Sequence, residues 1–336
     1  MRLRGRTTVL AAVGLIAVGL LGLCVWYWLD RRLAFDGRLQ DRHTYPARLL
    51  ERLATLPREL HESSGVAVSR TQPGILWSHN DSGDGPHLYA IDLSGRLRAT
   101  VRVTNAEARD WEDIAGGPCP RSFRSQPDGT SCLYVGDIGD NNRARSELAV
   151  YVVAEPSLEE TSGPPATIRA RSFRFRYPGG PTDSEALAVQ PDGDVTIVTK
   201  GWTGRVEFFR IAADNVARAL DSGELLTAEP SDPVGIDRDQ RIGPLVTGAA
   251  VSPDGMTLAV RTYTEVYFLR AAGAGDAGTR WQSLGRPCLL GAAEPLGEGI
   301  DFLDADTLVL TSERSGGRPG TLHRVRCDTM PPPSED

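Results

Sequence analysis

Lysine is almost absent from this chain of 336 residues. Lys200 is the only lysine, and 44 acidic residues against 37 basic ones give a formal net charge of −7. Nucleic-acid binding relies on a basic surface that neutralises phosphates. The charge balance therefore argues against a nucleic-acid partner.

Several enzyme motifs are also missing. No Gly-x-Ser-x-Gly sequence supplies a nucleophile elbow, and His61-Glu62 lacks the second histidine of a zincin. Residues 273–278 have the Gly-x-Gly-x-x-Gly spacing of a dinucleotide loop. No helix is expected after them, and phosphate binding needs that helix N-terminus. We therefore interpret 273–278 as a surface loop.

Cysteine is scarce, with five residues, four of which lie beyond the apolar N-terminal segment. No Cys-x-x-Cys pair or suitably spaced histidine accompanies them, which argues against zinc. Cys119 and Cys132 bracket one loop between neighbouring predicted strands, and Cys288 and Cys327 form the remaining pair. An even number of cysteines in an exported domain predicts these two disulfides.

Charged residues are absent from 7–29, a run long enough to cross a bilayer. Three arginines lie within the preceding stub, 1–6, and an aromatic cluster at 26–28 suits the far membrane interface. We predict a single-pass signal anchor over 7–29, with the C-terminal domain outside the cytoplasm. A cleaved signal peptide and a lipoprotein signal around Cys24 are the alternatives.

One sequence pattern recurs five times along the chain: a polar or acidic residue followed by a short run of small and apolar residues. The five versions are Ser64-Gly65-Val66-Ala67, Glu112-Asp113-Ile114-Ala115, Glu185-Ala186-Leu187-Ala188, Thr247-Gly248-Ala249-Ala250 and Glu298-Gly299-Ile300-Asp301. Each run is predicted to form the first strand of its repeat unit. Second strands are expected over 76–81, 133–137, 195–200, 258–262 and 308–313, and third strands over 88–93, 148–153, 206–211, 266–270 and 322–325.

Repeats of roughly 45–70 residues with three or four short strands indicate an all-β fold, a β-propeller of five blades. Six blades are an alternative, because the third interval is long. The segment 49–60 is expected to add the missing fourth strand to the last blade and so close the ring. We assign 30–47 to a linker, 48–327 to the propeller and 328–336 to a disordered tail.

The five repeated polar residues should meet at one mouth of the central channel, since the inner strands all start there. They are Ser64, Glu112, Glu185, Thr247 and Glu298. The ends of the second strands should approach the same mouth. Clustered carboxylates repel one another unless a cation or a basic side chain intervenes. A divalent cation such as Ca²⁺, a salt network made by Lys200 and Arg261, and simple pinning of loops are the three interpretations.

A second repeat, Asp-x-Gly-Asp, occurs at Asp81 and at Asp137, each time after a second strand. Short acidic loops with glycine suit Ca²⁺, although tight turns use the same residues. The predicted metal ligands are Asp81, Glu112, Asp137, Asp140, Glu185 and Glu298. The predicted ligand-binding residues are Asn80, Arg143, Thr247, Thr262 and Glu313. Arg143 is expected either to fold back onto Asp137 or Asp140 or to face an anionic substrate.

Several of these segments together resemble a group of bacterial exported β-propeller proteins of undefined activity. They are His61-Glu62-Ser63-Ser64-Gly65, the Asn80-Asp81 loop, Asp110-Trp111-Glu112-Asp113-Ile114, Gly136-Asp137-Ile138-Gly139-Asp140-Asn141, Ser184-Glu185-Ala186 and Gly297-Glu298-Gly299. The strand starts are similar to those of the esterase-like phytase family. More distantly, they resemble gluconolactonase/SMP-30-type propellers, which hold a divalent cation at the channel mouth. The resemblance implies such a cation here, whereas Ser64 and Thr247 depart from glutamate at two of the five positions.

Two functions follow as hypotheses. One is a membrane-anchored propeller that binds a cation, a ligand or an envelope protein at its acidic mouth. The other is a metal-dependent hydrolase of an anionic small molecule, a phosphoester or a lactone. Its catalytic residues would be Glu112, Glu185, Lys200 and Arg261. Whether the protein is an enzyme is left open by the sequence.

Overall fold

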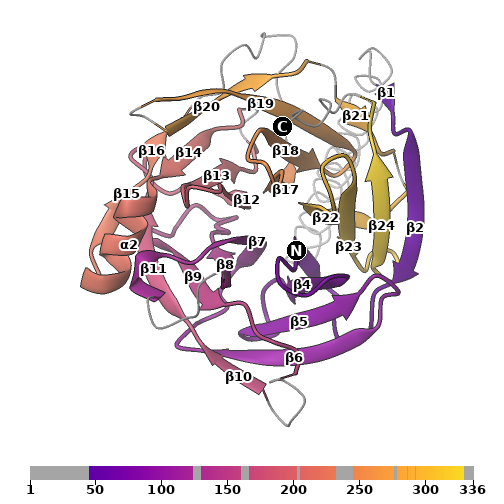
Figure 1. Cartoon of the computed structure of the whole chain (residues 1–336), viewed down its shortest axis with the longest axis horizontal. Coiled ribbons are helices and arrows are strands. Elements are labelled where there is room, and N and C mark those ends of the chain that lie inside the picture. Colours follow the sequence, from indigo (N-terminus) through magenta and orange to yellow (C-terminus); the bar gives the residue numbers. More distant parts are fainter. Residues whose placement is uncertain are drawn as a thin grey trace, which may run out of the picture. The chain divides into compact units, whose positions relative to one another are not determined.

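Five β-sheets are arranged like the blades of a propeller around one axis (Figure 1). The computed structural model describes residues 45–123, 130–159, 166–202, 205–231, 245–275, 278–285, 287–291 and 293–328. The chain is thus an all-β, five-bladed β-propeller, as predicted. The predicted anchor 7–29 and most of the predicted linker lie outside the described residues. Within the described part, no helix has the length and apolar character needed to span a membrane.

The blades follow one another along the chain, each with its first strand innermost. Blade 1 contains β3 (Ser63–Val68), β4 (Ile75–Asn80), β5 (His87–Asp92), β6 (Leu97–Thr104) and β10 (Ala166–Arg169). Blade 2 contains β7 (Trp111–Pro118), β8 (Ser131–Asp137), β9 (Leu148–Ala154), β11 (Arg171–Arg176) and β15 (Leu225–Thr227). Blade 3 contains β12 (Ser184–Val189), β13 (Val195–Thr199), β14 (Phe208–Ile211) and β16 (Glu229–Pro230). Blade 4 contains β17 (Val246–Val251), β18 (Thr257–Thr262), β19 (Glu265–Gly275), β20 (Gly278–Ser283), β21 (Cys288–Leu289) and β1 (Tyr45–Pro46). Blade 5 contains β22 (Leu296–Phe302), β23 (Leu308–Glu313), β24 (Thr321–Arg326) and β2 (Leu49–Thr55).

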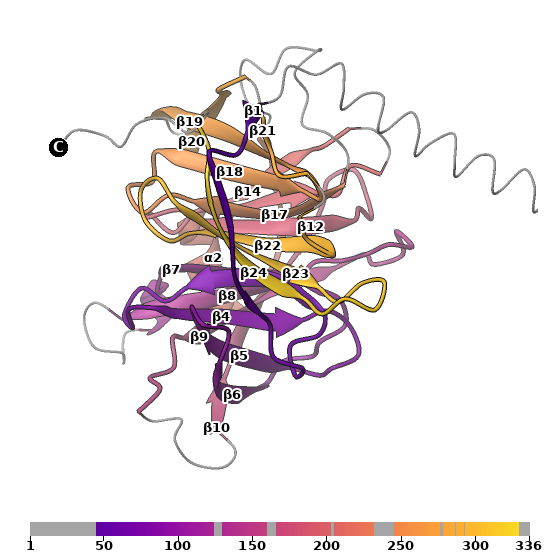
Figure 2. The ribbon, with the colours of Figure 1, turned by 90° about the vertical axis from the view of Figure 1, so that its right-hand side faces the viewer.

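The ring is closed by its N-terminal strand, as the sequence predicts. β2 pairs antiparallel with β24, so Leu49 lies opposite Arg326. Figure 2 shows β2 running beside β24 along the edge of blade 5. This pairing covers the backbone groups of an outer strand that would otherwise be exposed. Covering that edge ties the beginning of the described chain to its end.

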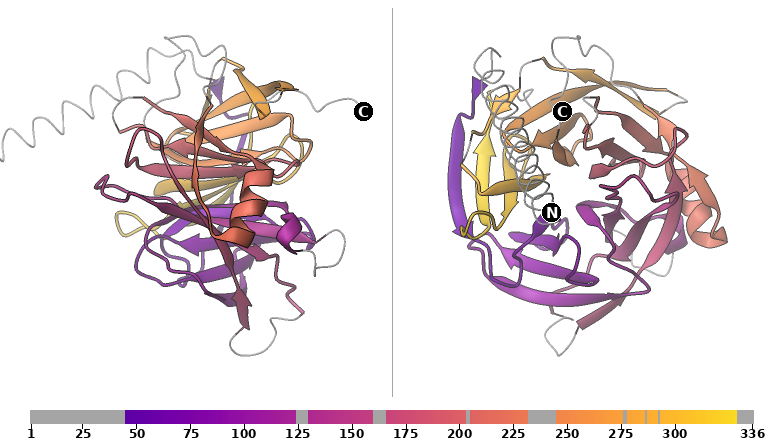
Figure 3. Two further views of the ribbon diagram at one scale, coloured as in Figure 1. Left: turned by 90° about the vertical axis from the view of Figure 1, so that its left-hand side faces the viewer. Right: turned by 180° about the vertical axis from the view of Figure 1, so that it is seen from behind.

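Neighbouring blades also share outer strands, which the sequence analysis did not anticipate. β10 follows β9 of blade 2 but pairs parallel with β6 of blade 1. β15 follows β14 of blade 3 but pairs parallel with β11 of blade 2. Helix α2 (Ala213–Ser222) lies in this second excursion, at the outer edge of the propeller (Figure 3). A parallel neighbour requires such a crossover, because both strands must run in the same direction.

The hydrophobic core is divided into five clusters, each between two adjacent blades. The cluster between blades 1 and 2 includes the fully buried Trp77 and Trp111. The inner part of each sheet therefore buries both faces, and strands there are nearly continuous apolar runs such as Leu-Ala-Val-Tyr-Val-Val in β9, whereas the outer strands β6 and β11 alternate between buried and exposed residues. Burial on both faces explains why simple polar–apolar alternation is absent from the inner strands.

The inner strands are held together by two buried carboxylates. Asp113 of β7 accepts hydrogen bonds from three backbone N–H groups, those of Ile114 (2.8 Å), Leu187 (2.9 Å) and Ala249 (3.2 Å). It thereby connects blades 2, 3 and 4. Asp301 of β22 accepts from the N–H of Val68 at 2.7 Å and so connects blades 5 and 1.

Glycine allows the inner strands to approach this closely. A Cβ atom at Gly65 would lie 2.7 Å from Ile114 N and 2.8 Å from an Asp113 carboxylate oxygen. A Cβ atom at Gly299 would lie 2.7 Å from Val66 N. Real Cβ atoms do not come so near, so these strand starts require the smallest residue.

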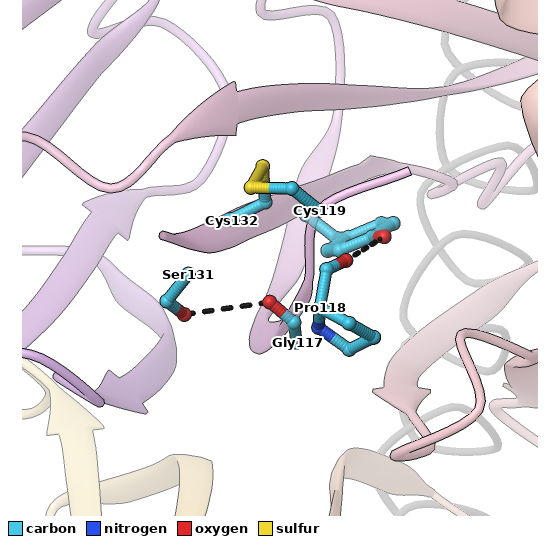
Figure 4. Close-up of a disulfide and its surroundings, with 6 residues drawn as sticks. Gly117, Pro118, Cys119, Ser131 and Cys132 are labelled. Carbon is cyan, nitrogen blue, oxygen red and sulfur yellow. Dashed lines mark hydrogen bonds between the residues drawn. A yellow bond between two sulfur atoms is a disulfide. The ribbon is translucent and has the colours of Figure 1, made fainter. Parts of the chain in front are cut away.

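Both predicted disulfides are present. Cys119 is bonded to Cys132 and Cys288 to Cys327. The first ties the end of β7 to the start of β8 (Figure 4). The second ties the outer part of blade 4 to the end of β24 in blade 5.

Replacing Asp113 with alanine should destabilise the propeller. Three buried N–H groups would lose their acceptor, and an unsatisfied buried donor costs about 1–3 kcal/mol. We expect the free energy of unfolding to fall by about 3 kcal/mol or more, measured by urea denaturation of the purified protein. The Glu107→Ala variant is the control: this exposed side chain makes only a 3.8 Å contact with Arg109, and its effect should stay within about 0.5 kcal/mol. Equal effects of the two substitutions would show that Asp113 does not hold the blades together.

Candidate functional site

A β-bulge lies at the start of every inner strand, at the residue that the sequence repeat singles out. In β3, Ser63 lies opposite Asn80 and Gly65 opposite His79, so Ser64 has no partner of its own. The register shifts in the same way around Glu112, Glu185, Thr247 and Glu298. A bulge redirects the extra side chain. We call these five residues the mouth ring; all are buried, with relative exposures of 1–5%.

The members of the mouth ring from blades 1, 2 and 3 lie close together. Ser64 Oγ donates to Glu112 Oε2 at 3.2 Å. Glu185 lies close enough to Glu112 for its charge to raise the pKa of Glu112. Lys200 Nζ in turn donates to Glu185 Oε1. The three blades that carry Ser64, Glu112 and Glu185 therefore meet at one point, as the sequence predicts for strand starts.

The glutamates of the mouth ring hold their protons more tightly than ordinary carboxyl groups. Burial and then the charge of Glu185 raise the pKa of Glu112 well above its usual value. Burial raises the pKa of Glu185 to about 7 even though Lys200 opposes the shift. Burial, with the charges of Glu185 and Glu313, also raises the pKa of Glu298 well above normal. Lys200 compensates only part of this negative charge.

Three carboxylates gather on the blade 1–blade 2 side of the ring: Asp81, which follows β4, Asp110, which precedes β7, and Glu112. One oxygen of each lies within 4.8 Å of the others. Gly139, in the loop after β8, leaves room for them, because a Cβ atom there would collide with Glu112 Oε1 and Asp110 Oδ2. Burial, together with the charge of Asp81, raises the pKa of Asp110 to about 6.

Further acidic groups surround these three carboxylates. Burial, together with the charges of Asp81 and Glu62, raises the pKa of Glu313 to about 7. Asp183 is buried, and its Oδ2 has no hydrogen-bond partner among the described residues. Tyr263 also faces the ring, where burial and the glutamates raise its pKa. We call this whole cluster, from the mouth ring outward, the acidic mouth.

Asp137 and Asp140, predicted as metal ligands, have other partners. Asp137 forms a 2.8 Å ion pair with Arg145. Asp140 accepts the backbone N–H groups of Ala144 (2.8 Å) and Arg145 (2.9 Å), as in a tight turn. The arginine that folds back onto this loop is thus Arg145, whereas Arg143 lines a small cavity beside Trp202. Sequence spacing could not separate two arginines that lie two positions apart on a loop.

Arg261 lies inside the blade interface instead of facing the mouth ring. Its guanidinium is fully buried and donates to the carbonyl oxygens of Gly299 (2.7 Å) and Thr311 (3.1 Å). Its ion-pair partner is Glu294, not Glu298 as the predicted salt network requires. These bonds join blade 4 to blade 5 and hold the guanidinium inside the interface, where its Nε is buried without a hydrogen-bond partner among the described residues.

Three predicted ligand-binding residues stabilise local backbone. Asn80 donates to the carbonyl oxygen of Glu59 and to Asp84, at 2.8 and 2.9 Å. Thr247 donates to the carbonyl oxygen of Glu298 at 3.1 Å. Thr262 accepts the N–H of Glu265 at 3.1 Å. Of the predicted set, Glu313 is the one that lies among the carboxylates of the acidic mouth.

The sequence analysis missed Asp110, Tyr263 and Glu294. Asp110 stood within the segment Asp110-Trp111-Glu112-Asp113, whose density of carboxylates was the available signal. Glu294 precedes its strand and is paired only through the tertiary fold. Tyr263 lies in the turn between β18 and β19, where no local pattern marks it.

Comparisons with known proteins identify no family. No protein-family model matches the chain, and no curated protein sequence matches it. Among solved structures, it is similar to a PQQ-bound aldose sugar dehydrogenase from Streptomyces coelicolor. The similarity covers 84% of this chain and 99% of that one, at 10% sequence identity and a TM-score of 0.42. At this level it assigns neither an activity nor a cofactor to this chain, and the resemblance to phytase-like and SMP-30-type propellers stays a prediction.

The raised carboxyl pKa values predict that the protein loses stability as the pH rises through 7. Glu185 and Glu313, each with a pKa of about 7, keep protons that the unfolded chain has released. Stability from these protons is therefore greatest at acidic pH. The buried His79 and His323, with pKa values of about 4, have the opposite effect, but only below about pH 6.5. With EDTA present, the melting temperature should be lower at about pH 8.5 than at about pH 6.5. The expected difference is about 2–4 °C for each kcal/mol of unfolding free energy that is lost.

The Glu313→Gln variant tests the assignment of this slope. It removes one titrating group and one of the charges acting on its neighbours, so its melting temperature should change less over the same pH interval. A wild-type melting temperature that rises toward pH 8.5, or an unchanged slope in the variant, would contradict the assignment to the acidic mouth.

Proposed function

We propose that this protein is a ligand-binding propeller whose acidic mouth binds a divalent cation, Ca²⁺. The observation that carries the proposal is the group formed by Asp81, Asp110 and Glu112, with oxygen atoms within 4.8 Å of one another. Three carboxylates this close repel one another unless they share protons or a cation. The resemblance of the strand starts to SMP-30-type propellers is in line with this proposal.

The coordination requirements of the two ions favour Ca²⁺ over Mg²⁺ at this cluster. Ca²⁺ binds oxygen at about 2.3–2.6 Å, so ligands on opposite sides of the ion are separated by roughly 4.6–5.2 Å. For Mg²⁺ at about 2.0–2.1 Å, the corresponding span is roughly 4.2 Å and the octahedral geometry is strict. The three oxygens lie within 4.8 Å of one another, a limit that the flexible coordination of Ca²⁺ accommodates.

The surroundings of Asp110 and Glu112 fit a cation as well. The absence of a side chain at Gly139 lets both carboxylates lie against its backbone, since a Cβ atom there would collide with Glu112 Oε1 and Asp110 Oδ2. Glu112, whose pKa is raised by burial and by the charge of Glu185, would release its proton when the ion binds, since metal ligands must be deprotonated. Lys200 already pairs with Glu185, so the ion would act on the side of the cluster that lacks a basic partner among the described residues.

Hydrolysis of a phosphoester or lactone is less well supported. A hydrolase needs a base within reach of the metal-bound water. Glu185, with a pKa of about 7, has suitable proton affinity, but Lys200 donates to one of its oxygens. Arg261, the predicted anion-holding group, is buried in the blade interface. We therefore propose binding as the function of this site.

Titration calorimetry of the purified full-length protein with CaCl₂ tests the cation proposal. We expect a saturable heat at pH 7.5 and a rise in melting temperature, since a ligand at 100 times its Kd stabilises by about 2.7 kcal/mol. Asp110→Asn and Glu112→Gln should each weaken Ca²⁺ binding by about tenfold or more. Gly139→Ala should weaken it as well, because the added methyl group occupies the space between these carboxylates.

Asp214→Asn is the matched control, since Asp214 is an exposed acid at the first turn of α2, outside the acidic mouth. It should leave the Ca²⁺ titration unchanged. Absence of any Ca²⁺ heat in the wild type, or equal affinity in Asp110→Asn and Asp214→Asn, would remove the proposed site.

We further propose that the propeller is exported and tethered by residues 7–29. The two disulfides support this, because such bonds persist in oxidising compartments. An acidic mouth outside the cytoplasm would meet Ca²⁺ at the higher concentrations for which weak carboxylate sites are suited. An envelope protein or an anionic molecule bridged by the ion would then be the partner.

Thiol labelling of the protein isolated from a bacterial host checks this placement. If the domain is exported, denaturation without reductant should expose one thiol, that of Cys24, and reduction should expose all five cysteines. Protease added to intact spheroplasts should degrade the propeller. Five free thiols before reduction, or full protection from protease, would contradict export.

A further inference from the structure

A cavity of about 330 Å³ lies at the opposite end of the propeller axis from the acidic mouth. It is formed where inner strands end: Gly116 and Gly117 of β7, Val189 of β12 and Val251 of β17 line it, with Arg70 from the turn after β3. Its volume falls at the lower end of the range of small-molecule sites, about 300–1,000 Å³.

The cavity has a floor, so it is separate from the acidic mouth. Further along the axis, the space between Ile114, Ala249 and Ile300 shrinks to about 10 Å³. Asp301 closes this narrow part, and both of its oxygens accept backbone N–H groups, from Val68 and Phe302, at 2.7 Å. A molecule in the cavity would therefore meet a closed end.

The walls combine apolar surface with one charge. Three prolines contribute to the rim: Pro118 is the last residue of β7, whereas Pro191 and Pro253 follow the ends of β12 and β17 by two residues. Among the described residues that line the cavity, Arg70 is the only charged one. Apolar walls with a single well-placed charged group are typical of sites for small organic ions.

Arg70 is available to a ligand. Its side chain is exposed and attracts the buried Asp301. No hydrogen bond or close ion pair joins it to another described residue. The acidic side chains in the adjacent hairpins accept hydrogen bonds within their own loops. Asp192 accepts one from the N–H of Asp194 at 3.0 Å, and Asp254 accepts one from the N–H of Met256 at 2.9 Å. The guanidinium thus keeps its donors free at the cavity.

The turn that carries Arg70 is held in place. Ser69 Oγ accepts the N–H of Gln72 at 2.8 Å and donates to Glu155 at the end of blade 2. Gln72 Nε2 donates to the carbonyl oxygen of Pro156 at 2.9 Å. These bonds fix the position of the turn before any ligand arrives, which lowers the entropic cost of binding.

The facing wall is fixed covalently. The Cys119–Cys132 disulfide joins the residue after Pro118 to β8, as Figure 4 shows. Beside it, Ser131 Oγ donates to the carbonyl oxygen of Gly117 at 3.4 Å, and Tyr134 donates to that of Pro118 at 2.6 Å. A rigid rim on one side and a positioned arginine on the other are properties of a preformed site.

We propose that this cavity binds a small organic carboxylate. The carboxylate would accept two hydrogen bonds from the Arg70 guanidinium, whose fork geometry matches it. The apolar body would lie against the prolines, Val189 and Val251. This site is independent of the cation at the acidic mouth.

Benzoate and hexanoate are the probes, with benzamide as the uncharged counterpart of benzoate. Titration calorimetry and ligand-observed NMR on the full-length protein should give a Kd of about 1 mM for at least one carboxylate. Arg70→Met should weaken it about tenfold or more. Arg70→Lys, which keeps the charge but loses the fork, should fall between the two. Arg102→Met, at an exposed position of β6, should bind as the wild type does.

Thermal melts of all variants show whether they fold. The proposal is overturned if neither carboxylate binds below about 10 mM, if benzamide binds as well as benzoate, or if folded Arg70→Met keeps the wild-type affinity. Retained Ca²⁺ heat in Arg70→Met would show that the two sites act separately.

Discussion

The close approach of five inner strands to one axis is the constraint on which the rest of the molecule depends. These strands carry no continuous sheet between them, since each pairs only within its own blade. Asp113 and Asp301 supply the missing connections by accepting backbone N–H groups across blade boundaries. Glycine at 65 and 299 makes the approach sterically possible. Leaving any of these buried N–H groups without an acceptor would cost free energy. The inner strands are therefore held in this one arrangement.

The same convergence creates the acidic mouth. A bulge at each strand start turns one side chain toward its counterparts in the other blades, and three of the five are glutamates. The three glutamates cannot all be ionised in a buried ring, which is why the pKa values of Glu112 and Glu298 are raised. This repulsion between carboxylates raises the free energy of the folded protein, and a cation bound at the acidic mouth would lower it. A site of this kind couples ligand binding to the stability of the hub.

The two ends of the axis differ in chemistry because all the inner strands run in the same direction along it. All five start at the acidic mouth, and at the other end the last residues of β7, β12 and β17, with Arg70 after β3, line the cavity. The starts carry acids on bulges, whereas the ends carry prolines and a single arginine. Since Asp301 and the narrow part of the axis separate them, the two proposed sites, with opposite charge preference, lie apart on one scaffold.

How much could be predicted follows from the range of the interactions involved. The repeated strand starts, the hairpin turns and the cysteine spacing are local, and they were sufficient for five blades, closure by β2, both disulfides and the convergence of Glu112, Glu185 and Glu298. Outer strands β10 and β15 escaped prediction because each pairs with a blade that is not its own. Helix α2 has its apolar face in Val216, Ala219 and Leu220, which become core only against blade 2.

By itself, the sequence determined which residues start the inner strands and that their acids would crowd together, because strand period and turn chemistry act over a few residues. Only the tertiary structure decided the partners of those acids. Arg145 rather than Arg143 reaches Asp137, Arg261 turns to Glu294, and Asp110 joins Asp81 and Glu112. Choices of this kind depend on a few ångströms of side-chain reach between blades, and no spacing along the chain encodes that distance.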